Sequence, residues 1–223
     1  MSFLDSLINS LSSSAKSTLN STVNNAISSA KSGAKSAVNK AVSNAGNAIK
    51  KAIETKSKTF TFASLPTTVD ELKALQGGDM KEPFASAAMT VLALNMYYTN
   101  KEAGIAAFDY VMGPDALSNL AISGIDMSIM QNGDKVAMSY FEGATPDNNY
   151  QPSTPYTLKV YEYSNSKDVY EDGYYRLFVK SGGADSERQI TLRNKKSTGE
   201  WFATEFASLY MGIKQGKEED PWA

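Results

Sequence analysis

Residues 83–99, PFASAAMTVLALNMYYT, decide the fold. Pro83 suits the first position of a helix, where a missing backbone N–H costs nothing. The residues after it are apolar on nearly every face of a helix, and a helix of that kind is buried in the middle of a domain. We therefore expect this segment to be the central core helix, and the other elements are placed outward from it.

Two further helices are expected after the core helix. The first, KEAGIAAFDYVM at 101–112, is stopped by Gly113-Pro114, and the second, PDALSNLAISGIDMSIMQ at 114–131, ends at Asn132-Gly133. Gly and Pro at these positions are ordinary helix stop signals.

The segment before the core helix predicts a strand and a short helix. Thr59–Ala63 alternates between polar and apolar residues, which is the pattern of a β-strand. Thr68 with Glu71 three residues later forms a capping box for a short helix to Leu75.

Beyond residue 134 the hydrophobic period changes from that of a helix to two, which indicates strands. The expected strands are KVAMSYF at 135–141, YTLKVYEY at 156–163, YYRLFVK at 174–180, RQITLR at 188–193 and EWFATEF at 200–206, with SLYMGI at 208–213 as a short closing helix. Helices first and strands afterwards predict an α+β domain in which an antiparallel meander packs on a helical layer. Trp201 and Phe206 are expected in its core, and Trp222 is expected to fold back over the helices.

The charge is divided unevenly along the 223 residues. Residues 1–58 carry eight lysines against two acidic residues, a sum of +6, whereas residues 59–223 carry 14 basic against 22 acidic residues, a sum of −8, which gives the overall −2. We predict two parts, a Ser/Ala/Lys-rich amphipathic helical segment at 1–58 and a globular domain at 59–223. Such an asymmetry indicates an attracting surface at one end.

The N-terminal segment carries a thin apolar stripe in helical steps of three and four residues. Its period is close to eleven residues in three turns, which disfavours a heptad coiled coil. The 13 Ser and 7 Asn between residues 2 and 49 lower helix propensity, so we expect helix mainly when a surface is present. The positions expected to face that surface are Leu4, Ile8, Leu11, Leu19, Val23, Ile27, Val38 and Ile49.

Several surfaces fit this stripe. An anionic membrane suits a narrow apolar face flanked by lysines, although the lysines do not form one clean arc. A partner helix, self-association into a homo-oligomeric bundle, docking on the acidic domain, and plain disorder are the alternatives. Nucleic acid is not expected, because scattered lysines without arginine or interleaved aromatic residues track a phosphate backbone poorly.

The chain contains neither Cys nor His. Disulfides, thiolate or His/Cys metal sites and Ser-His-Asp or Cys-His nucleophile systems are therefore excluded, and we expect no cofactor and no metal. The N-terminus lacks a secretory pattern, and no run approaches the ~20 apolar residues of a membrane span. These observations predict a cytoplasmic protein that is at most peripheral at the membrane.

Carboxylate chemistry is the main catalytic option left. Asp168, Glu171 and Asp172 form one acidic group, and Asp185 and Glu187 form another, and either could serve a glycosidase-like hydrolase. Both groups lie beside glycine turns, where acidic residues are normally just solvated.

Tyrosine is concentrated in one region. Eight of the twelve tyrosines fall between residues 140 and 175, interleaved with Pro152 and Pro155. Tyrosine-rich loops supply rigid amphipathic contact area for proteins or small ligands, so Tyr150, Tyr156 and Tyr170 are the candidate ligand surface. The competing interpretation is that tyrosine is simply a favoured strand residue.

Several stretches of the domain also resemble a known family. FEGATPDNNYQPSTPY at 141–156, LFVKSGGADSERQITLR at 177–193, GEWFATEFASLYMGI at 199–213 and the terminal EDPWA are similar to an uncharacterised family of Gram-positive bacterial proteins, a domain of unknown function. The resemblance covers about residues 58–223. It implies no catalytic residue, because the family has no assigned activity.

The sequence therefore predicts a non-enzymatic binding or interaction protein, in which the N-terminal helix attaches the α+β domain to a membrane surface or an assembly. One alternative is a structural protein that self-assembles through bundled N-terminal helices. The other is a His-independent hydrolase that uses the carboxylates.

Overall fold

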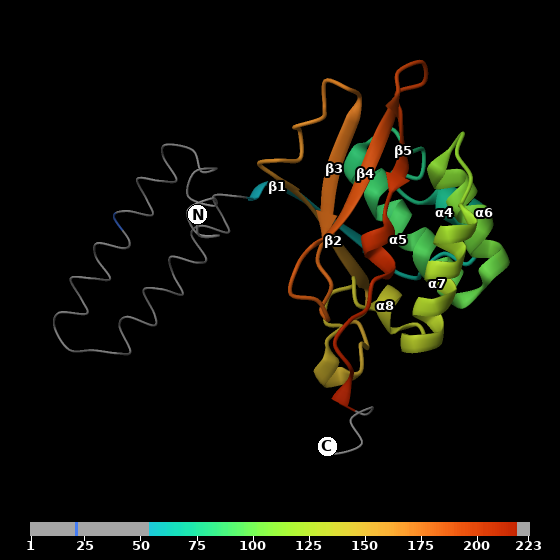
Figure 1. The fold of residues 1–223 in the computed structure, drawn as a ribbon, viewed down its shortest axis with the longest axis vertical. Coiled ribbons are helices and arrows are strands. Elements are labelled where there is room, and N and C mark those ends of the chain that lie inside the picture. Colours follow the sequence, from blue (N-terminus) through green and yellow to red (C-terminus); the bar gives the residue numbers. More distant parts are fainter. Residues whose placement is uncertain (1–20, 22–53, 218–223) are drawn as a thin grey trace. The chain divides into compact units, whose positions relative to one another are not determined.

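The computed structural model describes Ser21 and residues 54–217. It confirms the α+β class: five strands form one sheet, and the helices pack against it (Figure 1). The strands are β1 (Glu54–Phe62), β2 (Tyr156–Tyr163), β3 (Tyr174–Val179), β4 (Arg188–Lys195) and β5 (Glu200–Glu205). The helices are α4 (Val69–Ala74), α5 (Pro83–Thr99), α6 (Lys101–Met112), α7 (Asn119–Asn132) and α8 (Lys135–Met138), with 3₁₀ turns η1 (Pro146–Asn148) and η2 (Ala207–Tyr210).

Helix α5 is the centre of the core, as the sequence predicts. Every residue from Phe84 to Tyr97 is buried, and the helix contacts α6, α8 and strands β2 to β5. The Glu82 side chain caps its start by accepting hydrogen bonds from the backbone N–H groups of Phe84 and Ala85. Helix α6 approaches closely at Gly104, where a Cβ atom would lie 2.1 Å from the Cα of Tyr97.

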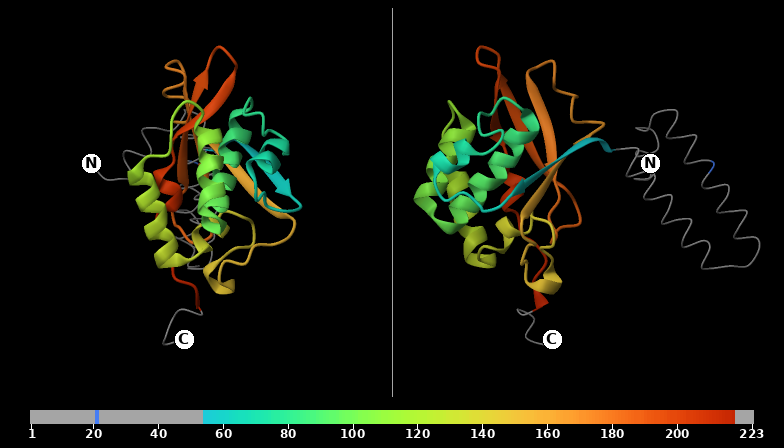
Figure 2. Two further views of the ribbon diagram at one scale, coloured as in Figure 1. Left: turned by 90° about the vertical axis from the view of Figure 1, so that its right-hand side faces the viewer. Right: turned by 180° about the vertical axis from the view of Figure 1, so that it is seen from behind.

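The sheet has the strand order β1-β2-β3-β4-β5, and β2 to β5 form an antiparallel meander. Successive side chains of a strand point to opposite faces of the sheet. One face carries apolar side chains that pack on the helices, such as Leu158 and Val160 of β2 and Leu177 and Val179 of β3, all with 0% exposure. Among the described residues, the helices lie on this face alone (Figures 1 and 2), so the other is called the open face here.

The N-cap of α4 and the buried aromatic residues agree with the sequence analysis. The Thr68 hydroxyl accepts from the N–H of Glu71, and α4 follows directly. The other half of the expected capping box differs, because the Glu71 carboxylate accepts from the N–H of Thr67 at 2.7 Å. Trp201 and Phe206 are buried in the core, as expected. Trp222 lies outside the described residues.

The expected strand at 135–141 is wrong. Lys135–Met138 forms helix α8, and the buried residues are neighbours in the sequence, Val136 with Ala137 and Ser139 to Phe141, rather than alternate ones. The alternation of larger apolar residues at 136, 138 and 140 is too short to separate strand from helix. Contacts with α5 and η2 decide the outcome.

Two boundaries also differ from the prediction. Helix α7 begins at Asn119 rather than at residue 114, because Ser118 is the N-cap and its hydroxyl accepts from the N–H of Ala121. Strand β1 begins at Glu54, so residues 54–58, expected in the helical segment, are extended. The sequence already shows the period of a strand here, because Lys56, Lys58, Phe60 and Phe62 alternate with Ser or Thr.

The remaining N-terminal predictions lie outside the described residues, including the stripe positions Leu4, Ile8, Leu11, Leu19, Val23, Ile27, Val38 and Ile49. Between residues 54 and 217, no helix combines the length and apolar content that crossing a membrane requires.

Candidate functional site

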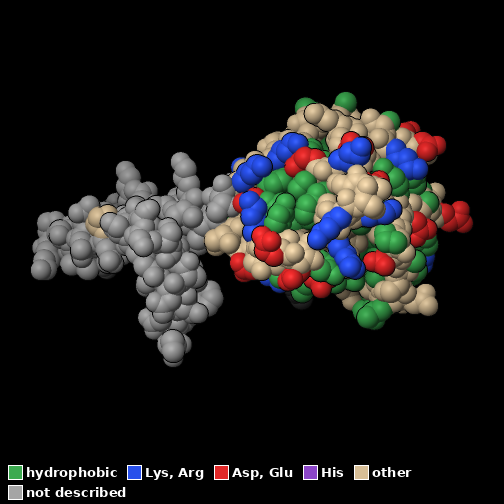
Figure 3. Space-filling view, turned by 90° about the horizontal axis from the view of Figure 1, so that it is seen from above, with side chains coloured by type: hydrophobic (Ala, Val, Ile, Leu, Met, Phe, Trp, Pro, Cys, Tyr) green, Lys and Arg blue, Asp and Glu red, His purple; other side chains and the backbone are tan. Residues whose placement is uncertain are grey.

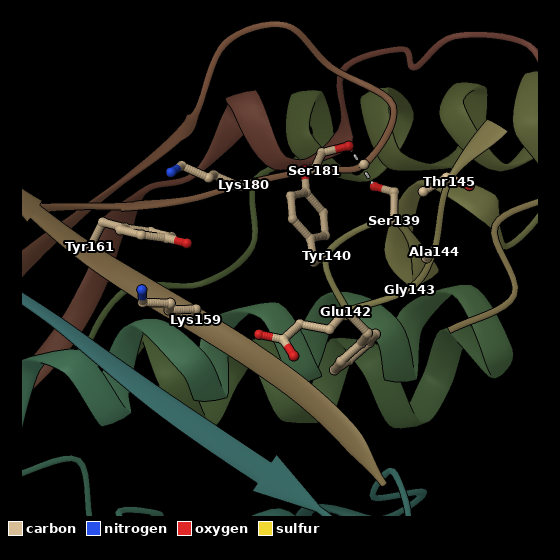
Figure 4. A pocket seen from close by; sticks show the side chains of 12 residues that line it. Ser139, Tyr140, Glu142, Gly143, Ala144, Thr145, Lys159, Tyr161, Lys180 and Ser181 are labelled. Atoms are coloured by element: carbon tan, nitrogen blue, oxygen red, sulfur yellow. Dashed lines mark hydrogen bonds between the residues drawn. The ribbon is translucent and has the colours of Figure 1, made fainter. Parts of the chain in front are cut away.

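A cavity of about 250 Å³ opens near the end of β3 (Figure 4). Three segments form its walls: residues 139–145 after α8, positions 159 and 161 of β2, and residues 180–182 after β3. We call it the lysine pocket, after Lys159 and Lys180. Segments distant in the sequence therefore meet at this one place.

The sheet register brings the two lysines together. Val160 lies opposite Val179 and Tyr161 opposite Phe178, so one further step places Lys159 opposite Lys180. Both alternate with core residues and therefore belong to the open face.

Tyr161 lies between the two amino groups (Figure 4). The Nζ atom of Lys180 is 4.2 Å from the centre of the Tyr161 ring, and that of Lys159 is 4.9 Å from it. The negative face of an aromatic ring attracts a cation at such distances. The ring, itself 8% exposed, therefore holds both cations at the pocket.

Two buried hydroxyls shape the pocket wall. Ser139 Oγ donates to the carbonyl of Val136 at 2.7 Å, so the 2.8 Å contact between the two serine oxygens is a donation from Ser181 to Ser139. Ser181 Oγ also accepts from the N–H of Gly183 at 3.1 Å. Both serine protons are thus used within the protein, and these hydroxyls fix the turn rather than offering a nucleophile.

The same turn is tied to the opposite wall. The N–H of Gly182 donates to the carbonyl of Ser139 at 2.8 Å. A Cβ atom on Gly182 would lie 1.8 Å from the carbonyl oxygen of Ala144, which shows how closely the two segments approach.

Asn148 organises the loop that forms the rest of this wall. Its Oδ1 accepts from the N–H of Thr145 at 2.9 Å, and its Nδ2 donates to the carbonyls of Gly143 and Gln151, each at 2.8 Å. The Tyr150 hydroxyl donates to the carbonyl of Lys214. These bonds hold the pocket walls in one arrangement before any ligand arrives.

The charges of the pocket are predominantly positive. Lys159 and Lys180 are its cations, and Glu142 is the one carboxylate in its lining. Two positive charges and one negative charge give +1, in a chain whose net charge is −2. At the end of the molecule shown in Figure 3, by contrast, basic, acidic and hydrophobic side chains are interspersed.

Tyr140 borders the pocket as a protonated phenol. Burial raises the pKa of the Tyr140 hydroxyl well above its usual range, and the nearby Arg188 guanidinium opposes this shift only in part. The hydroxyl donates to the carbonyl of Leu209 at 2.5 Å. At neutral pH it therefore acts as a structural donor.

Aromatic side chains continue from the pocket along the open face. Tyr161 stacks on Tyr163 with ring centres 6.1 Å apart, and Tyr163 meets Phe178 edge to face at 5.1 Å. The Tyr163 hydroxyl donates to Glu187 at 3.1 Å. The pocket thus opens beside an apolar surface that a larger ligand could also contact.

The three tyrosines proposed from the sequence do not form one surface. Tyr150 is 2% exposed and packs against Gly183, and Tyr156 is half-buried against Phe141. Tyr170 is 43% exposed in the β2–β3 loop, beyond the far end of β2, where it packs on Tyr175 and Trp201.

The two acidic groups stay apart from the pocket. Asp168, Glu171 and Asp172 are exposed in the β2–β3 loop. Asp185 pairs with Lys214 at 2.5 Å, and Glu187 accepts from Tyr163. Within the described residues, no cluster of three or more acidic side chains could hold a metal ion.

Sequence reasoning missed the lysines of the pocket. The sequence pattern that could have revealed them is their place in two consecutive predicted strands. Lys159 takes a non-core position of YTLKVYEY, and Lys180 takes one of YYRLFVK. The register that makes them neighbours depends on the ten residues between β2 and β3, from 164 to 173.

The chain belongs to the family described as domain of unknown function (DUF6935), whose model matches residues 64–217. All residues that line the lysine pocket lie within this match. Comparison with curated proteins and with solved structures gives no match.

Proposed function

We propose that the DUF6935 domain is a non-enzymatic binding module that takes a small ligand, or one end of a larger ligand, in the lysine pocket. The observation that carries this proposal is the preformed cavity of about 250 Å³ with converging polar groups. Ligand sites are typically concave, largely preformed and equipped with a few precisely placed polar side chains.

The arrangement of the pocket favours binding over catalysis. A nucleophilic mechanism needs a hydroxyl or amine beside a general base. The protons of Ser139 and Ser181 are used inside the wall, and Tyr140 donates to a backbone carbonyl. The carboxylates required by the hydrolase alternative lie on loops outside the pocket lining.

The pocket is tested with a library of small anionic, cationic and neutral molecules, screened against the full chain by ligand-observed saturation-transfer NMR. Glu142→Trp adds bulk in the pocket lining at an exposed residue whose side chain makes no hydrogen bond within the described region. Glu171→Trp makes the same change on the exposed β2–β3 loop and is the matched control.

We expect library members to bind wild type and Glu171→Trp and to lose binding to Glu142→Trp. The proposal fails if no member binds, or if Glu142→Trp binds as well as the control. Chemical conversion of a bound molecule would instead favour the hydrolase.

We propose further that the segment before β1, residues 1–53, attaches this module to an anionic membrane surface or to an assembly. The support comes from the sequence: an apolar stripe in helical steps, and six lysines against one acidic residue, a charge of +5 on residues 1–53. Such a segment gains affinity both from buried apolar area and from attraction to anionic lipid.

Vesicle co-sedimentation with phosphatidylglycerol and phosphatidylcholine tests this attachment. Three glutamates on the stripe should abolish binding, whereas three glutamates between stripe positions, with the same change in charge, should reduce it only modestly. The two variants are Ile8→Glu/Leu19→Glu/Ile27→Glu and Ser10→Glu/Ser21→Glu/Ser28→Glu. Equal loss in both would contradict an apolar stripe, and helix content that rises with protein concentration without lipid would favour self-assembly.

A further inference from the structure

We infer that the lysine pocket is selective for an oxyanion, a carboxylate or phosphate group on a small ligand, held by the amino groups of Lys159 and Lys180. This inference rests on the proposed binding function and adds the chemical class of the ligand.

The first argument is the pairing of like charges. The register of β2 and β3, continued by one residue, places Lys159 opposite Lys180, the residue directly after β3, on the same face of the sheet. Like charges at directly opposed positions destabilise a sheet. The Tyr161 ring holds both ammonium groups at the cavity. An anion bound there is therefore attracted by each of them.

The second argument is the distribution of acidic side chains around the pocket. Lys180 makes no ion pair with any described residue. Two acidic residues on the surrounding loops have other cations, because Asp185 pairs with Lys214 at 2.5 Å and Asp147 pairs with Lys217 at 3.1 Å. A third, Glu187, accepts from the Tyr163 hydroxyl. Glu142 is thus the one carboxylate of the described lining that opposes a bound anion.

The third argument is size. A water molecule in the liquid takes about 30 Å³, so a cavity of about 250 Å³ has room for an oxyanion and a short attached group. Lysine ammonium groups act as point charges that accept either a planar carboxylate or a tetrahedral phosphate. The walls therefore specify charge and size more strongly than the geometry of the anion.

The test is an NMR titration of the full chain with inorganic phosphate and, separately, with acetate, at constant ionic strength. Amide shifts of Gly143, Ser181 and Gly182 report the pocket, since these residues line it. Saturation with phosphate alone identifies a phosphate-bearing ligand, and saturation with acetate identifies a carboxylate-bearing one; either supports the inference.

Substitutions that remove a positive or a negative charge from the pocket should change the affinity for an anion in opposite directions. Lys180→Gln should raise the dissociation constant about three- to fivefold, as expected for the loss of one exposed charge. Lys180→Arg keeps the charge and should bring the dissociation constant most of the way back to that of wild type. Glu142→Gln should tighten binding by a similar factor, because it removes the opposing carboxylate. Lys195→Gln, at an exposed position at the end of β4, should change nothing and is the matched control.

The inference is overturned if neither anion shifts the pocket amides, or if Lys195→Gln weakens binding as much as Lys180→Gln. It is also overturned if Glu142→Gln weakens binding. The proposed binding function stands even then, provided that neutral or cationic library members bind wild type and lose binding to Glu142→Trp. Failure of the oxyanion inference can therefore be distinguished from failure of the binding function.

Discussion

Gly182→Ala should disrupt the wall of the lysine pocket. The added Cβ would lie 1.8 Å from the carbonyl oxygen of Ala144 and 3.0 Å from its carbonyl carbon. Non-bonded heavy atoms settle at roughly 3.5 Å, so one wall must retreat by well over 1 Å. That movement also stretches the 2.8 Å bond from the N–H of Gly182 to Ser139.

The cost of this substitution follows from two terms. Overpacking costs ~1–3 kcal/mol, and a lost backbone hydrogen bond costs about 1 kcal/mol. The free energy of unfolding should therefore fall by roughly 2–4 kcal/mol. For a chain of 150–250 residues each kcal/mol lowers Tm by about 2–4 °C, which predicts a loss of roughly 5–15 °C.

Thermal unfolding followed by circular dichroism measures this loss. Gly212→Ala is the matched control, because a Cβ at Gly212 meets nothing within 4 Å. The control should have the same Tm as wild type. Gly182→Ala should also lose the amide shifts that phosphate or acetate causes in the NMR titration. A Tm for Gly182→Ala equal to that of the control would refute the close contact between the two walls.

Two further predictions concern the core and alkaline pH. Leu92→Ala removes a side chain with 0% exposure from α5 and should cost ~3 kcal/mol in urea unfolding, whereas Leu120→Ala, 83% exposed on α7, should cost under ~0.5 kcal/mol; equal costs would contradict the burial described for α5. Burial raises the pKa of Tyr98 from 10.0 to about 12, so between these pH values the folded chain keeps the Tyr98 proton and the unfolded chain loses it. Stability should be complete below pH 10 and fall between pH 10 and about 12, by up to ~1.4 kcal/mol per pH unit for this group. Urea unfolding at stepped alkaline pH checks this, and a Tyr98→Phe variant that loses stability as steeply as wild type would remove Tyr98 as a cause.

The helical part of the fold was largely predictable from local signals. Helix α5 begins at Pro83 and ends before Asn100, and α6 ends before Gly113, as the sequence indicates. Pro, Asn and Gly act through their own backbone preferences, so these boundaries need no knowledge of distant contacts. Segment 135–141 depends instead on packing with α5 and η2, and there the local pattern misled.

The site was predictable only in part. The sequence predicts β2 with its observed bounds and β3 with one residue too many, so Lys159 falls on a non-core position of β2 and Lys180 directly follows β3. Which residues face each other across the strands is set by the long connection between them, whose geometry the sequence does not reveal. Tyrosine enrichment drew attention to this region, yet Tyr150 is buried by the loop that Asn148 organises.

The position of α5 in the chain has a consequence for synthesis on the ribosome. This helix is complete at Thr99, but its cover of strands is complete only at Glu205, 106 residues later. At about 5–20 residues per second, the nascent chain carries an uncovered apolar helix for roughly 5–20 s. During that interval the meander is incomplete, and a holdase chaperone would compete for the surface that its strands later take.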